Sequence, residues 1–121
     1  MNNIELIETE WYFRDLMFRN YNKGVLQFDI EDIADNLVLT YLRYRNVEPA
    51  HIASILKVIL ENLISCKFLE RRDDFVRLRD GISRLQCGKC YYICYLGNLE
   101  ERLCLRCKNN DLRTFPKKKL T

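Results

Sequence analysis

The sequence of 121 residues predicts an α+β protein in which three helices and a β-hairpin precede a cysteine-rich segment. Three observations lead to this prediction. Apolar residues recur at helical spacing in three stretches before residue 66. Two short β-prone runs then flank a polar turn at residues 72–74, and five of the six cysteines follow between residues 87 and 107. We therefore expect two parts, a domain over residues 1–82 and a cysteine-rich metal-binding module with a basic tail over residues 83–121.

The first helix is expected over residues 3–22. Its apolar positions follow a helical period, acidic residues occupy its first turns, and Gly24 stands where a helix often ends. Residues 25–28 are β-prone and predict a short strand. Asp29 then has the character of an N-cap for a second helix that runs to residues 45–46.

Pro49 is typical of the first turn of a helix, and a broad apolar stripe follows it to residue 65. These two features predict a third helix over residues 49–65. Residues 68–79 read as a hairpin. The order helix, short strand, helix, helix, hairpin is that of a winged helix-turn-helix domain, which is the fold class we predict for residues 1–82. Another small α+β bundle is the alternative.

The cysteines form two C-x2-C pairs, Cys87 with Cys90 and Cys104 with Cys107, separated by 13 residues. Each pair can form a tight turn that points two thiolates at one place, and the intervening residues can form a hairpin that brings the two turns together. Four thiolates at about 2.3 Å then surround one zinc ion as a tetrahedron. Because all four ligands are thiolates, we expect a closed, structural centre.

Cys94 leaves an alternative open. It follows Cys90 by four residues, and an iron–sulfur cluster tolerates less regular spacing than zinc. In that case Cys94 replaces Cys104 or Cys107. With zinc, Cys94 is a small buried side chain. The spacing favours zinc.

Other uses of the cysteines are less favoured. The N-terminus lacks a basic stretch followed by an apolar block, so no signal peptide is predicted, and no run of about 18 apolar residues predicts a membrane helix. We expect a cytoplasmic protein, or a nuclear one in a eukaryote, where disulfides are disfavoured. A reactive thiol would need a nearby base, and the only histidine, His51, lies far from the cluster in sequence.

The sequence carries no sign of an enzyme. Its four glycines form no phosphate-binding loop, and no nucleophile or metalloprotease motif is present. We therefore expect no catalytic residues and no small-molecule substrate.

Charge is distributed unevenly along the chain. Residues 1–65 carry 6 Lys and Arg against 10 Asp and Glu, whereas residues 66–121 carry 14 against 7. The exposed face expected for the third helix, with His51, Lys57 and Glu61, is poor in side chains that read bases. We expect weak DNA binding through backbone phosphates. The residues predicted to make these contacts are Arg71, Arg72, Arg77 and Arg79 of the hairpin and Lys117, Lys118 and Lys119 of the tail.

The acidic first half predicts a protein partner. Trp11, Tyr12 and Phe13 are adjacent, and one helix cannot bury all three in the same core. Trp11 and Tyr12 are therefore candidate partner-binding residues, with packing against the cysteine module as the alternative.

This combination resembles a known family. A winged helix followed by Cys87-Gly88-Lys89-Cys90, with Cys94 as the third ligand and Cys107 as the last, is similar to the beta subunit of the archaeal general transcription factor TFE. It is also similar to the winged-helix, iron–sulfur subunit of RNA polymerase III. Cys104 has no place in that pattern.

The resemblance implies a [4Fe–4S] cluster and a non-enzymatic initiation factor subunit. Such a subunit pairs with a second winged-helix subunit, binds RNA polymerase and helps to open promoter DNA. The alternative is a stand-alone DNA-binding regulator that combines a winged helix with a zinc ribbon.

Overall fold

The computed structural model describes residues 3–114, and these form a mixed α+β fold with two small sheets. The helices are α1 (Asn3–Tyr21), α2 (Ile30–Thr40) and α3 (Pro49–Ser65), with a 3-10 turn, η1 (Leu42–Tyr44), between the last two. The strands are β1 (Gln27–Asp29), β2 (Leu69–Arg72), β3 (Phe75–Leu78), β4 (Ile82–Cys87), β5 (Ile93–Gly97) and β6 (Leu112–Thr114). The predicted α+β class is therefore confirmed.

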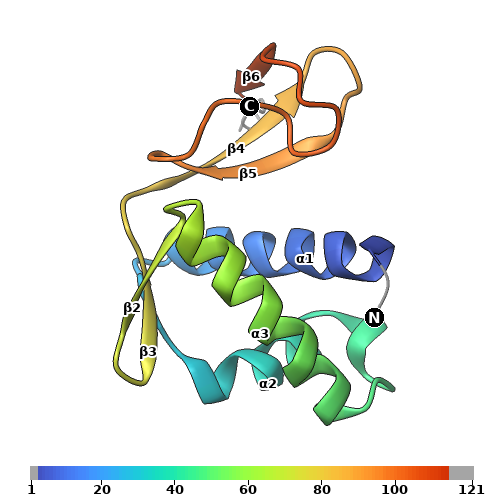
Figure 1. Ribbon diagram of the computed structural model, residues 1–121, viewed down its shortest axis with the longest axis vertical. Coiled ribbons are helices and arrows are strands. Elements are labelled where there is room, and N and C mark those ends of the chain that lie inside the picture. The colour runs from blue at the N-terminus through green and yellow to red at the C-terminus, as the bar shows by residue number, and fades with distance from the viewer. Residues whose placement is uncertain (1–2, 115–121) are drawn as a thin grey trace, which may run out of the picture.

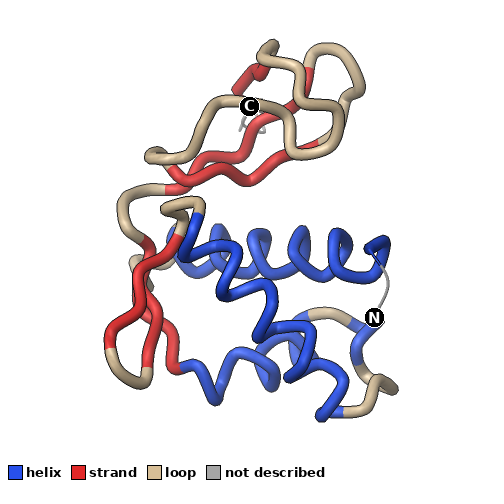
Figure 2. Tube along the Cα trace, in the orientation of Figure 1, coloured by secondary structure: helices blue, strands red, loops and turns tan. Residues whose placement is uncertain are grey.

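Helix α1 lies between the two other helices and the cysteine-containing sheet (Figure 1). The first sheet has the order β1-β3-β2 and places the β2–β3 hairpin at one end of the helices. The second sheet has the order β5-β4-β6 and covers the opposite side of α1 from α2 (Figure 2).

Local sequence signals explain most element boundaries. The Asp29 side chain accepts a hydrogen bond from the backbone N–H of Glu31 at 3.0 Å, which is the predicted N-cap of α2. Pro49 begins α3, whose predicted bounds agree with the observed ones. The hairpin turns at residues 73–74, where Asp73 adopts φ 50°.

The second helix is shorter than predicted. It ends at Thr40 because Tyr41 adopts an extended conformation, with φ −121° and ψ 118°. This conformation sends the Tyr41 side chain into the core, where its hydroxyl donates a hydrogen bond to the Asp15 carboxylate of α1. A long-range contact thus overrides the helical pattern that continues through residue 46.

The main core joins the helices to both sheets. Phe13 and Met17 of α1 are fully buried with Ile59 and Leu63 of α3, and the same cluster includes Tyr95 of β5. A smaller cluster around the cysteines consists of Leu85, Cys87, Cys94, Leu96 and Cys104. The cysteine-rich sheet therefore has little apolar core of its own.

Cys66 follows α3 beside the apolar residues Phe68 and Leu69, a position that predicts core packing, but its side chain is exposed. Its thiol lies 3.3 Å from a Glu100 carboxylate oxygen.

None of the helices within residues 3–114 combines the length and the apolar character that a membrane-spanning helix requires.

Candidate metal centre

Each C-x2-C pair forms a tight turn, or knuckle, around the sulfur of its first cysteine. The Cys87 sulfur accepts hydrogen bonds from the backbone N–H groups of Lys89 and Cys90, both at 3.4 Å. The Cys104 sulfur accepts from Arg106 at 3.4 Å and from Cys107 at 3.5 Å. Donors aimed at a sulfur stabilise its thiolate form, which is the form that binds a metal.

The two knuckles also close in the same way. The N–H of Tyr91 donates to the carbonyl oxygen of Cys87 at 3.0 Å, and the N–H of Lys108 donates to that of Cys104 at 3.0 Å. The residue after each second cysteine turns into the left-handed region, with φ 62° at Tyr91 and 65° at Lys108. This conformation costs free energy for a residue other than glycine. Its presence after both second cysteines indicates that the turn of each knuckle imposes it.

The four knuckle sulfurs come together at one point. The sulfurs of Cys87, Cys90, Cys104 and Cys107 all lie within 4.8 Å of one another. Cys87 and Cys107 are 3.6 Å apart, and so are Cys90 and Cys104. A tetrahedron with metal–sulfur distances of about 2.3 Å has edges of about 3.8 Å, so the four thiols fit a single ion.

Strand pairing holds the knuckles together. Cys87 ends β4 and is paired with Leu112 of β6, just beyond the second knuckle. The N–H of Gly88 donates to the carbonyl of Asp111 at 2.7 Å. A Cβ at Gly88 would lie 2.1 Å from an Asp111 carboxylate oxygen, so a larger residue here would displace the exposed Asp111 side chain.

The electrostatic environments of Cys87, Cys94 and Cys104 differ. Burial alone would raise the pKa of Cys104, but the N–H groups of Cys107 and Arg106 outweigh it and lower the pKa to about 6. The N–H of Cys90 lowers the pKa of Cys87 in the same way. Burial raises the pKa of the Cys94 thiol to about 11.

Cys94 lies beside the four-sulfur set. It is fully buried on β5, and its sulfur is 3.8 Å from that of Cys104. It accepts a hydrogen bond from the N–H of Leu105 at 3.5 Å. The group of four mutually close sulfurs therefore contains Cys104, and Cys94 is an adjacent fifth thiol.

The four hairpin arginines predicted to contact DNA are exposed. Arg71 and Arg72 lie on β2, Arg77 lies on β3 and Arg79 follows it. Acidic residues accompany them, since Glu70 pairs with Arg72 at 3.4 Å and Asp73 and Asp74 form the turn. Lys117, Lys118 and Lys119 lie outside the residues that the structure describes.

Trp11 and Tyr12 both pack within the protein. The Trp11 ring N–H donates to the carbonyl of Ile93 on β5 at 2.9 Å, and its ring meets Tyr95 edge-on at 5.4 Å. Tyr12 packs edge-on against Tyr41 at 4.8 Å. Both side chains remain half-buried, so each also presents an edge to solvent.

Sequence reasoning missed the buried polar residues that join α1 to β5. Arg14 donates to the carbonyl of Tyr95 at 2.6 Å and to both carboxylate oxygens of Glu100 at 2.7 and 3.0 Å. Asp15 accepts a hydrogen bond from the Tyr95 hydroxyl at 2.5 Å. The i,i+4 pairs Glu10–Arg14 and Asp15–Arg19 were visible in the sequence, but such pairs commonly lie on exposed helix surfaces.

The chain matches no protein-family model, no curated protein and no solved structure. The resemblance to the TFE beta subunit therefore stays a prediction.

Proposed function

We propose that this chain is a non-enzymatic transcription factor in which a winged helix-turn-helix domain is joined to a structural zinc centre. The observation that carries the proposal is the β1-β3-β2 sheet, which lies at one end of the three packed helices. Its β2–β3 hairpin bears exposed arginines. In a winged helix the third helix and the hairpin are the elements that approach DNA.

The spacing of the four sulfurs supports zinc, and not a cubane cluster, in this proposal. In a [4Fe–4S] cluster each thiolate binds a different iron, which places the sulfurs farther apart than around a single ion. The four sulfurs here are within 4.8 Å of one another, as one ion requires. Tetrahedral sites with four thiolates hold zinc or iron, so metal analysis of the purified protein tests this assignment. About one zinc per chain supports it, and about four irons per chain would contradict it.

The DNA contacts we propose are weak and made to phosphates. The exposed face of α3 offers Lys57 and Glu61, and His51 contacts Glu5 of α1. Carboxylates at Glu70, Asp73, Asp74 and Asp80 lie close to these arginines in the chain, which favours a few local phosphate contacts over a broad basic field. A protein with such contacts needs a partner to place it on a promoter, and RNA polymerase with a second winged-helix subunit is the partner we propose.

A stand-alone regulator is the second candidate. The observation that favours it is the presence of Cys104 in the four-sulfur set, because this gives zinc-ribbon spacing in place of the ligand set of the TFE beta subunit. Such a regulator would bind one duplex sequence far more tightly than random DNA. The polymerase-associated factor would show little sequence preference.

Titration of a labelled random duplex at several salt concentrations tests the DNA contacts. If Arg71, Arg77 and Arg79 each neutralise one phosphate, changing all three to Gln lowers the slope of log K against log salt by about 3. Changing Lys23, Arg45 and Lys67, which are exposed and lie outside α3 and the hairpin strands, to Gln is the matched control. Equal slopes for the hairpin variant and the wild type would make the chain a protein adaptor that does not touch DNA through its hairpin.

A further inference from the structure

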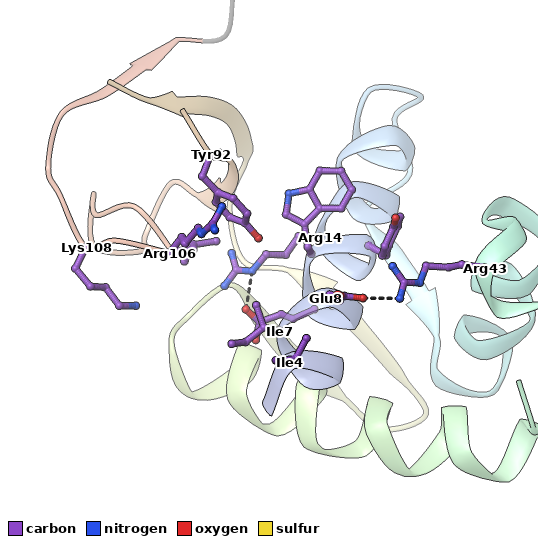
Figure 3. A pocket seen from close by; sticks show the side chains of 12 residues that line it. Ile4, Ile7, Glu8, Arg14, Arg43, Tyr92, Arg106 and Lys108 are labelled. Atoms are coloured by element: carbon purple, nitrogen blue, oxygen red, sulfur yellow. Dashed lines mark hydrogen bonds and ion pairs between the residues drawn. The ribbon is translucent and has the colours of Figure 1, made fainter. Parts of the chain in front are cut away.

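A groove lies between α1 and the second knuckle, and we call it the α1 groove (Figure 3). One wall consists of Ile4, Ile7 and Trp11 of α1, and the other of Leu105, Arg106 and Lys108, with Tyr92 at its end. Its volume is about 920 Å³. The groove is therefore large enough to accept several side chains of a bound segment.

The first turns of the α1 wall carry two apolar side chains, Ile4 and Ile7, that the described residues leave largely uncovered. Ile4 is 71% exposed and Ile7 is 61% exposed. With Trp11 they follow the spacing i, i+3, i+7, which places them on one face of the helix. An exposed stripe of this kind is what an amphipathic helical segment covers when it binds in a groove.

The charges of the groove are arranged asymmetrically. On the α1 side, Glu8 pairs with Arg43, and Glu10 pairs with Arg14 at 3.3 Å. On the knuckle side, Arg106 and Lys108 are exposed, and neither has a carboxylate partner within residues 3–114. The Arg106 guanidinium lies over the Tyr92 ring at 5.7 Å, which holds it at the rim of the groove.

We propose that the α1 groove binds an acidic amphipathic segment of a partner protein. Apolar side chains of the segment cover Ile4 and Ile7, and its carboxylates pair with Arg106 and Lys108. Opposite charge across the rim fixes which way the segment lies and favours acidic partners. This inference depends on neither the identity of the metal nor the proposed DNA contacts, although it extends the proposed role of Trp11 and Tyr12 in partner binding.

Nucleic acid is a poorer occupant. Ile4 and Ile7 are the most exposed side chains of its α1 wall, and aliphatic side chains neither pair with phosphates nor stack on bases.

Selection of peptides from a random display library on the full, metal-loaded chain tests the proposal. The double variant Arg106→Glu, Lys108→Glu serves for counter-selection, and its metal content is measured to show that the knuckle is intact. We expect the recovered peptides to be rich in Asp and Glu, with apolar residues at i, i+3 or i+4 spacing. The proposal would be overturned if no peptide bound the wild type in preference to the double variant. Recovery of basic peptides would also overturn it.

The binding of a recovered peptide can be followed at the groove itself, because Trp11 is the only tryptophan of the chain. We expect saturable changes in its emission, and at least a tenfold loss of affinity in the double variant. The variant Ile4→Ser, Ile7→Ser should lose affinity similarly, and both positions are exposed, so its fold should persist.

The variant Arg45→Glu, Lys57→Glu makes the same change in net charge away from the groove and should bind the peptide as the wild type does. An equal loss of peptide affinity in this control would show that net charge alone causes the effect, and this would overturn the proposal. Displacement of the peptide by an oligonucleotide of random sequence would assign the groove to nucleic acid. Sedimentation showing a self-associated chain that excludes the peptide would assign it to a second copy.

Discussion

The sulfurs of Cys94 and Cys104, both buried and 3.8 Å apart, distinguish the two ligand sets that could hold a metal. Cys104 belongs to the four mutually close sulfurs, whereas Cys94 does not. We therefore expect Cys94→Ala to keep about one ion per chain, and Cys104→Ala to lose it. Metal analysis after gel filtration measures both. Loss of metal in Cys94→Ala with retention in Cys104→Ala would restore the ligand set implied by the TFE beta subunit.

Asp15 provides a pH-dependent contribution to stability. Burial alone would raise the pKa of its carboxyl group, but hydrogen bonds from Tyr41, Tyr95 and Arg19 outweigh burial and lower it below the ordinary value of 3.8. A carboxyl group whose pKa is lowered by folding stabilises the fold above its unfolded pKa, and this contribution disappears as the pH falls through the folded pKa. The stabilising contribution of Asp15 should therefore be complete at neutral pH and fade in acid below about pH 3.8.

Asp15→Asn tests this contribution. We expect it to lower the free energy of unfolding at pH 7 by about 1.5–3 kcal/mol, because hydrogen bonds to a charged group are lost. The difference from the wild type should shrink below about pH 3.8. Denaturant titrations of both proteins measure it, with the metal content followed at each pH. Asp35→Asn, an exposed change on α2, is the control, and a difference that stays constant in acid would contradict the assignment to Asp15.

At the scale of elements, the end of α3 carries backbone strain. Lys67 follows the C-cap residue Cys66 and adopts φ 69°, the left-handed conformation that glycine usually occupies at this position. The N–H of Phe68 then donates to the carbonyl of Leu63 at 3.0 Å and closes the helix. The side chain of Lys67 is exposed, so little packing would be lost by removing it.

We therefore expect Lys67→Gly to raise the free energy of unfolding by about 1 kcal/mol. Lys67→Ala keeps the strained conformation while removing the same charge, and it should change the stability by less than about 0.5 kcal/mol. Thermal or denaturant unfolding measures both variants. Equal effects of Gly and Ala would show that charge, and not backbone conformation, matters at this position.

The elements also show how far the sequence alone could lead. The bounds of α3 were predictable because Pro49 and an apolar stripe are local signals, and the two C-x2-C pairs predicted the four close sulfurs. The end of α2 was not predictable, because it depends on the bond between Tyr41 and Asp15, 26 residues apart. Packing of Trp11 against the cysteine module was one of the two alternatives that the sequence left open, but the carbonyl that holds its ring there, 82 residues away, could not be identified. Local patterns carry no information about such long-range partners.

At the scale of the whole molecule, α1 joins the helices to the cysteine-rich sheet through buried charge. Arg14 is only 3% exposed, and it pairs with Glu100, whose side chain is 6% exposed. Removing one partner of a buried ion pair leaves the other uncompensated. We expect Arg14→Met to lower the free energy of unfolding by about 3–5 kcal/mol.

Two further variants give this expectation its controls. Arg43→Met breaks an exposed pair with Glu8 and should cost no more than about 1 kcal/mol. Combining Arg14→Met with Glu100→Leu removes both buried charges and should recover part of the loss. Denaturant unfolding measures all three, and equal costs for Arg14→Met and Arg43→Met would contradict a buried role for Arg14.

Removal of the metal tests how the two parts depend on each other. Three of the five buried residues in the small core of the sheet are cysteines, Cys87, Cys94 and Cys104. We therefore expect a metal bound at the four sulfurs to supply much of the stability of this part, on the order of 10 kcal/mol. The core of the helices is larger and mostly independent of the cysteines. A chelator should therefore unfold β4–β6 while most of the helical signal in far-ultraviolet circular dichroism persists.

Trp11 reports on the same event, because its ring N–H bonds to Ile93 and its ring packs on Tyr95 of β5. Its emission should move to longer wavelength as β5 detaches, and added zinc should reverse the change. If the helical signal were lost together with the change in Trp11 emission, α1 would need β5 to fold. Residues 1–82 would then not form an independent domain. Unchanged emission after complete metal removal would mean that hydrogen bonds and packing hold the sheet against α1 without the ion.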